Sequence, residues 1–262
     1  MKRHFFFSVI IGALLSASIA HAAEPKLRWL GHSAFEYSSR GGKIFLIDPW
    51  ITNPKAPKNI VFTHIEGILV THGHADHVGE AFDLAKKFNA PLVASYELAE
   101  IAKKHGVQNV LPLNPNGSIK IETVMITAVP AVHSSSYKEG ENNVYAGAPM
   151  GFIVADEGAP AFYHAGDTGV FSDMSLIAEL YNPQIALLPI GGLYTMKPAE
   201  AAIAARNLQA RTIIPMHYGT FPALSGTPAE LEREMKRLGV LSRVVVLTPG
   251  QEVTLKELAA VK

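Results

Sequence analysis

Three histidines and one aspartate lie within six residues of one another, directly after an apolar segment at residues 67–70. The four are His72, His74, Asp76 and His77, in the order H-x-H-x-D-H. Imidazole and carboxylate groups form the ligand sets that hold zinc, manganese or iron in proteins. Residues two apart in an extended turn converge from one side of the chain, while Asp76 and His77, at the start of the next helix, point to a second metal. The motif therefore predicts a metal site, against the alternative of a polar, solvated loop.

Three further candidate ligands follow, each at the end of a predicted strand or in the loop after it. They are His133, Asp167 and His217. Side chains that gather from several strand ends at one edge of a sheet are a common way to build an active site. The chain has no cysteine, which excludes a thiolate ligand and a cysteine nucleophile.

The elements that must position these residues are short strands with helices between them. Strands are predicted over residues 27–30, 34–37, 44–47, 68–70, 92–94, 151–155, 161–164, 185–188, 213–215, 244–247 and 252–255, and residues 119–129 are a strand or hairpin arm. Helices are predicted over residues 78–88, from the cap Ser95 to about 104, over 172–181 and 198–208, and from a capping box at 227–230 to near 239. This order favours an α/β domain in which two sheets form the core and helices cover both outer faces.

Composition narrows the class of protein. Of 262 residues, 48% are hydrophobic and only 18% are charged, which allows an ample core and argues against disorder. Basic and acidic residues number 23 each, and no run of lysine or arginine marks a nucleic-acid track. We therefore expect a small-molecule substrate and no nucleic-acid partner. The oligomeric state stays open, with a homo-oligomer as one possibility.

Residues 1–22 have the pattern of a secretory signal peptide. Two basic residues near the start precede an apolar run over residues 5–15, and Ala-His-Ala at 20–22 fits the A-x-A cleavage pattern. Cleavage after Ala22 would leave a single domain over residues 23–262, periplasmic or secreted and not stably inserted in a membrane. The alternative is an uncleaved membrane anchor, for which the apolar run is short.

The motifs together resemble the metallo-β-lactamase fold superfamily, and within it the uncharacterised metal-dependent hydrolases similar to ascorbate-phosphate lactonases. The residues that carry the resemblance are 31–35, 48–49, 71–79, 133–136, 163–171, 187–192, 195–196 and 215–221. It extends over nearly the whole chain after residue 22. The fold that it implies is a four-layer αββα sandwich, with two mixed β-sheets flanked by helices.

The resemblance also implies a site for two divalent metal ions. The first ion would be held by His72, His74 and His133, the second by Asp76, His77 and His217, and Asp167 would bridge them. Zinc is the expected ion, with manganese or iron as alternatives. A bridging acid offsets the repulsion between two cations and sets their spacing.

The implied chemistry is hydrolysis. Metal-activated hydroxide would attack a small ester, lactone or phosphodiester, and catalytic Asp76 would orient the water or pass a proton to the leaving group. Two alternatives from other classes are an iron-dependent oxidoreductase on the same fold and a non-catalytic metal- or ligand-binding protein. A true β-lactamase is disfavoured by the His-rich outer residues, and a nuclease by the neutral charge.

Four residues outside the ligand set are candidates for substrate contact or for support of the ligands. Asp48 would accept a proton from a ligand imidazole and so set its tautomer. His32 and His164 would line the pocket or have a structural role, and Tyr194 would contact substrate. Leu193 stands at a position where many members of the branch that this chain resembles carry a polar residue. The leucine predicts a more apolar pocket.

Overall fold

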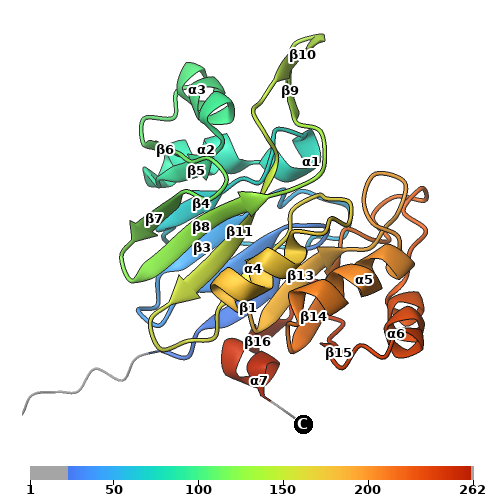
Figure 1. The fold of residues 1–262 in the computed structure, drawn as a ribbon. Coiled ribbons are helices and arrows are strands. Elements are labelled where there is room, and N and C mark those ends of the chain that lie inside the picture. The colour runs from blue at the N-terminus through green and yellow to red at the C-terminus, as the bar shows by residue number, and fades with distance from the viewer. Residues whose placement is uncertain (1–22, 261–262) are drawn as a thin grey trace, which may run out of the picture.

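Two seven-stranded β-sheets face each other in the computed structural model, which describes residues 23–260 (Figure 1). The predicted signal peptide, residues 1–22, lies outside the described residues. Within the described range, no helix combines the length and the apolar character that a membrane span requires.

The first sheet contains the N-terminal strands and one strand from the C-terminal end, in the order β16-β1-β2-β3-β4-β5-β6. These strands are β1 Lys26–Trp29, β2 Phe35–Ser38, β3 Ile44–Ile47, β4 Gly67–Leu69, β5 Leu92–Ala94, β6 Val110–Pro112 and β16 Glu252–Thr254. Pairing is antiparallel from β16 to β3 and parallel from β3 to β6.

The second sheet has the order β15-β14-β13-β12-β11-β8-β7. Its strands are β7 Ser118–Ile121, β8 Val124–Pro130, β11 Met150–Asp156, β12 Phe162–His164, β13 Ile185–Pro189, β14 Thr212–Met216 and β15 Arg243–Val244. Pairing is parallel from β15 to β12 and antiparallel from β12 to β7. Each sheet thus joins a parallel half to an antiparallel half.

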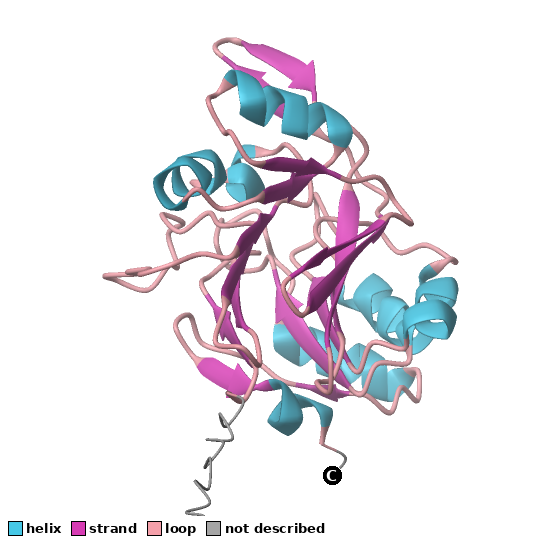
Figure 2. Cartoon of the chain, turned by 90° about the vertical axis from the view of Figure 1, so that its left-hand side faces the viewer, coloured by secondary structure: helices cyan, strands magenta, loops and turns pink. Residues whose placement is uncertain are grey.

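Helices lie outside the two sheets and complete the αββα sandwich (Figure 2). Those on the side of the first sheet are α1 Ala75–Val78, α2 Ala81–Phe88 and α3 Tyr96–Lys104. Those on the side of the second sheet are α4 Met174–Tyr181, α5 Pro198–Leu208 and α6 Pro228–Arg237, and α7 Leu255–Ala259 lies near the C-terminal end. A separate hairpin, β9 Ser136–Glu139 with β10 Asn142–Tyr145, projects beyond the sheets (Figure 1).

Alternating side chains of the first sheet divide the core in two. Phe45 and Ile47 of β3 belong to the core between the sheets, whereas Leu46 belongs to the core under α2 and α3. Successive side chains of a strand point to opposite faces, so a strand between two layers must be apolar on both. This explains why β3 is a continuous apolar run rather than an alternating one.

The helix predicted over residues 78–88 is divided in the structure, which corrects that prediction. α1 ends at Val78, and α2 begins at Ala81. Gly79 between them has φ +42°, and a Cβ atom there would lie 2.3 Å from the Cα of Trp50. The contact with Trp50 therefore requires glycine, and α1 is a separate turn that carries Asp76 and His77.

Other predicted elements differ at their ends. Residues 119–129 form a hairpin that turns near Glu122, where φ is +53°. The strand predicted over 244–247 is shorter, at Arg243–Val244, and the one predicted to residue 255 ends at Thr254. Thr254 caps α7 through its bond from the Glu257 amide. The strands β6, β9 and β10 and the helix α7 were not predicted.

Candidate metal centre

The candidate ligands leave the carboxyl ends of strands from both sheets. The H-x-H-x-D-H loop follows β4, His133 follows β8, Asp167 follows β12, and His217 follows β14. Strand pairing sets where each strand ends, so residues far apart in sequence reach one edge of the sandwich. The gathering at strand ends expected from the sequence is what the structure contains.

The three histidines predicted to hold a first ion form one group. The ligand atoms of His72, His74 and His133 all lie within 4.8 Å of one another, and His72 Nε2 is 2.9 Å from His74 Nδ1. Burial is the largest cause that lowers the pKa of each of these imidazoles, and the neighbouring charge on His77 lowers all three further. Neutral imidazoles are the form that binds a metal.

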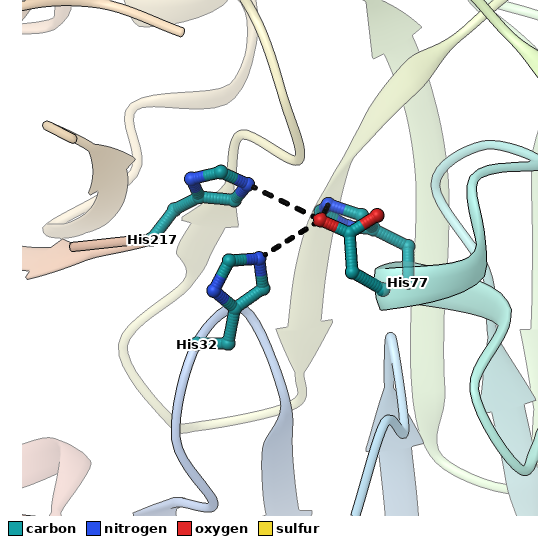
Figure 3. A group of neighbouring side chains, drawn as sticks. His32, His77 and His217 are labelled. Carbon is teal, nitrogen blue, oxygen red and sulfur yellow. Dashed lines mark hydrogen bonds and ion pairs between the residues drawn. The ribbon is translucent and has the colours of Figure 1, made fainter. Parts of the chain in front are cut away.

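The residues predicted to hold a second ion form another group, with His32 beside them (Figure 3). One Asp76 carboxylate oxygen, Oδ2, lies 3.7 Å from His217 Nε2 and 4.0 Å from His77 Nε2. The same oxygen lies 3.1 Å from His32 Nε2. His32 is therefore a direct hydrogen-bond partner of a candidate ligand and does more than line a pocket.

Asp167 lies between the two groups. Its Oδ2 atom is 3.6 Å from Nε2 of His133, in the first group, and 3.3 and 3.1 Å from Nε2 of His77 and His217, in the second. Burial would raise the pKa of Asp167, but the charges of His77 and His217 hold it well below its usual range. The result is a buried carboxylate facing imidazoles from both groups, the arrangement that a bridging ligand requires.

Several buried polar atoms at this centre have no hydrogen-bond partner. Among the described residues, nine buried side-chain nitrogen or oxygen atoms lack one, and five of them belong to His77, His133, Asp167 and His217. Buried polar atoms are normally bonded, so a cluster of exceptions requires an explanation. A bound cation would occupy these lone pairs, and the donor set fits zinc, manganese or iron.

Asp48 connects the two groups through hydrogen bonds to one imidazole of each, directly to His77 and through Thr71 to His72. Its Oδ2 atom accepts hydrogen bonds of 2.7 Å from both the Thr71 hydroxyl and Nδ1–H of His77. Because Thr71 donates its proton to Asp48, its oxygen accepts from Nδ1 of His72, 3.0 Å away. With Nδ1 bonded in each ring, Nε2 is the atom that each imidazole would offer to a metal, the arrangement that outer carboxylates give to ligating histidines. Asp48 is predicted from the sequence beside one ligand imidazole, but the role of Thr71 is not, and its position next to His72 is the only local signal for it.

His32 is also held in one orientation. Burial lowers the pKa of His32 to about 4, against the raising effect of the bond to Asp76, so the ring is neutral at pH 7. With Nε2–H directed at Asp76, its Nδ1 accepts from the Thr220 hydroxyl 2.8 Å away. Thr220, whose role no sequence motif indicated, thus supports Asp76 through His32.

His164 does not line the pocket, which corrects one of the two roles considered for it. It is fully buried, its Nε2–H donates to the Ser33 carbonyl at 2.9 Å, and its Nδ1 accepts from the Gly166 amide. Both ring nitrogens are therefore used in bonds to backbone. These bonds tie the β1–β2 turn to the loop that carries Asp167.

A cavity of about 440 Å³ opens over the two groups. Its lining consists of His74, Asp76, His133, Ser134, Asp167, Leu193, Tyr194 and His217. Tyr194, predicted to contact substrate, is among them. A small molecule that enters this cavity would meet five of the seven candidate ligands directly.

Backbone strain is concentrated around this cavity. Within residues 23–260, ten non-glycine residues have positive φ, and four of them are His32, Asp48, Leu193 and His217. Four of the other six are asparagines, the residue type that adopts this conformation most readily after glycine. Strained residues persist where the surrounding structure holds them, often at functional sites.

Comparison with known proteins gives consistent matches. The family profile described as Beta-lactamase superfamily domain matches residues 43–218. A UPF0173 metal-dependent hydrolase of Myxococcus xanthus is 46% identical over 243 residues, covering 92% of this chain and 87% of that protein. Another, from Methanopyrus kandleri, is 47% identical over 227 residues, covering 86% and 98%. The structure of Igni18, a metallo hydrolase from Ignicoccus hospitalis, superposes with a TM-score of 0.78 at 36% identity, covering 88% and 98%.

Proposed function

The chain belongs to the beta-lactamase superfamily, in which it is a metal-dependent hydrolase. From this premise we propose that it is an exported enzyme that holds two divalent ions. Its proposed substrate is a small ester, lactone or phosphodiester. The observation that carries the dinuclear part is the position of Asp167. One of its oxygen atoms lies within 3.6 Å of imidazole nitrogens from both ligand groups.

The first ion would be held by His72, His74 and His133, and the second by Asp76, His77 and His217. Asp167 would bridge them, and zinc is the expected metal. Bound ions would supply Lewis acidity to the scissile group and would lower the pKa of water toward 7. The chain's own residues determine where a substrate and a proton go.

Asp76 is suited to proton transfer as well as to ligation. Its side chain is 31% exposed and lines the cavity, whereas the side chain of Asp167 is 4% exposed. Burial would raise the pKa of Asp76, but the nearby His217 imidazole, 3.7 Å away, and the hydrogen bond from His32 hold it below its usual range, so it stays a carboxylate. We propose that it accepts a hydrogen bond from the attacking water and that His32 holds it in that orientation.

Export rests on the predicted signal peptide at residues 1–22, and a periplasmic or secreted enzyme would follow from its cleavage. Expression of the full chain in a bacterial host, fractionation, and N-terminal sequencing of the product test this. A new N-terminus at Ala23 in the periplasm or medium supports export. A full-length chain in the membrane fraction would contradict it.

The test of the hydrolase begins with metal analysis. The chain is purified without chelators and without a metal-affinity column, and metal per chain is measured before hydrolysis of p-nitrophenyl acetate, γ-butyrolactone and bis(p-nitrophenyl) phosphate. About two zinc or manganese ions per chain with turnover of at least one probe supports the proposal. One ion per chain at full activity would contradict the dinuclear part, and no turnover of any probe would contradict the substrate classes proposed.

A further inference from the structure

The cavity over the candidate metal centre is lined by acidic, imidazole, hydroxyl and apolar side chains. Among the described residues, none of those that line it is a lysine or an arginine. Enzymes that bind a phosphate or a second carboxylate of a substrate usually hold it with such cations. Here an anionic group away from the reacting bond would meet no such cation among the side chains that line the cavity.

Exposed apolar side chains lie at the cavity or next to a candidate ligand in the sequence. Leu193 and Tyr194 line the cavity yet are 67% and 62% exposed, and Val132, next to His133, is 56% exposed. Single exposed apolar residues are ordinary. Several gathered beside the candidate ligands are a contact surface for an apolar partner.

Leu193 occupies a strained backbone position. Its φ is +59°, and the Tyr194 amide donates to the Gly192 carbonyl across it at 2.7 Å. The Gly192 amide bonds in turn to the carbonyl of Met196, whose side chain is fully buried. The loop is thus anchored at its base, and leucine is a poor residue for the turn itself. Its apolar side chain at the cavity, rather than its backbone preference, accounts for its presence there.

We infer that the substrate is a neutral carboxylic ester or lactone whose apolar part lies against Leu193 and Tyr194, an inference that rests on the proposed hydrolase function. In the reaction, a water oxygen bonds to the carbonyl carbon and the acyl carbon–oxygen bond breaks. The departing alkoxide takes a proton from that water, and a carboxylic acid is released. A lactone opens in the same way to a hydroxy acid, and no oxidant or other reactant is needed.

The test compares kcat/KM for p-nitrophenyl octanoate, p-nitrophenyl acetate and bis(p-nitrophenyl) phosphate, using the metal-containing enzyme. We expect octanoate to exceed acetate by about tenfold, which is about 1.4 kcal/mol and less than the burial of two methylene groups. We expect the phosphodiester to be the poorest of the three. In Leu193→Asn, the octanoate-to-acetate ratio should fall below about threefold, because the apolar contact is lost while asparagine tolerates the positive φ.

Leu180→Asn is the matched control, since Leu180 is 66% exposed but lies on α4 and does not line the cavity. It should keep the wild-type ratio. Tyr194→Ser gives a second test should Leu193→Asn fail to fold. An octanoate-to-acetate ratio near one in the wild type, a ratio unchanged in both cavity variants, or a preference for the phosphodiester would overturn the inference while the hydrolase proposal stands. No turnover of any of the three probes by the metal-containing enzyme would overturn both.

Discussion

The buried residues of the candidate metal centre and the exposed apolar residues at or next to its cavity are built in opposite ways. We call Asp48, His72, His77 and Asp167 the floor, and Val132, Leu193 and Tyr194 the rim. Floor residues are at most 3% exposed, whereas rim residues are at least 56% exposed. In the floor, hydrogen bonds through Thr71 and Asp48 connect His72 to His77, whereas the rim presents apolar groups to solvent.

This difference assigns separate tasks to the two regions. Asp48 bonds His77 directly and His72 through Thr71, so these positions are over-determined and the strain at Asp48 is tolerated. Rim side chains are exposed and can be changed at little cost to the fold. We therefore expect floor variants to lose the chemistry for every substrate, and rim variants to alter the choice among substrates.

The largest effect is expected at Asp167. Asp167→Asn should lower kcat/KM by at least about a thousandfold, because several kcal/mol of transition-state stabilisation is lost with the bridge between the ions. Metal per chain should fall in parallel, and chelation of the wild type should lower its Tm by removing ligand-linked stability. The measurements are steady-state kinetics, metal analysis and thermal unfolding.

Asp156→Asn is the control for Asp167→Asn. Asp156 is 4% exposed and bonds Tyr37, Thr123 and the Arg40 amide on the far part of the sandwich. Its replacement should reduce stability but keep the metal content. Equal metal loss in both variants would contradict the expectation that Asp167, rather than any buried aspartate, holds the metal ions.

A smaller loss is expected at Asp48. Asp48→Asn should weaken metal binding or activity by about 10- to 100-fold, the usual effect of removing a carboxylate that orients ligand imidazoles. Both His72 and His77 lose their fixed tautomer, so both ions should be affected. Competition with a chromogenic chelator measures this, and release of only one ion would show that the connection through Thr71 to His72 does not matter.

Gly79 tests how the floor is positioned by backbone. Gly79→Ala should lower the free energy of unfolding by about 2 kcal/mol, because the new Cβ would meet the Trp50 backbone and φ is +42°. Gly140→Ala is the control, with φ +59° but no atom within 4 Å of the added Cβ, and should cost about 1 kcal/mol. Urea unfolding measures both, and equal values would mean that the close approach to Trp50 is not costly.

The smallest effect is expected on the rim and has the opposite sign. Leu193→Asn should raise the free energy of unfolding by about 0.5 kcal/mol, since asparagine relieves the strain at φ +59°. Leu180→Asn, of equal exposure on helix α4, should lower it by a similar amount through helix propensity. A destabilised Leu193→Asn would mean that the leucine contributes to the fold and is not kept only for contact at the cavity.

Local patterns in the sequence determined the elements and most of the candidate centre. Apolar runs bounded by glycine, proline and capping residues located nearly all of the long strands and helices, because side-chain periodicity and capping depend on neighbours a few residues away. The short spacing of His72, His74, Asp76 and His77 marked the metal loop for the same reason. Resemblance to a known superfamily added His133, Asp167 and His217 as ligands of the same centre, and the structure brings them together.

Contacts between residues that lie far apart in the sequence follow from the tertiary structure alone. Thr220 reaches His32 from 188 positions away, and His32 reaches Asp76 from 44. The break at Gly79 likewise depends on Trp50 of another loop. These contacts follow from strand pairing and from the packing of two sheets, which act across the whole chain and leave no periodicity in any local window. The residue types and their spacing therefore indicate the chemistry of the centre, and the packing of the two sheets sets the geometry that orients it.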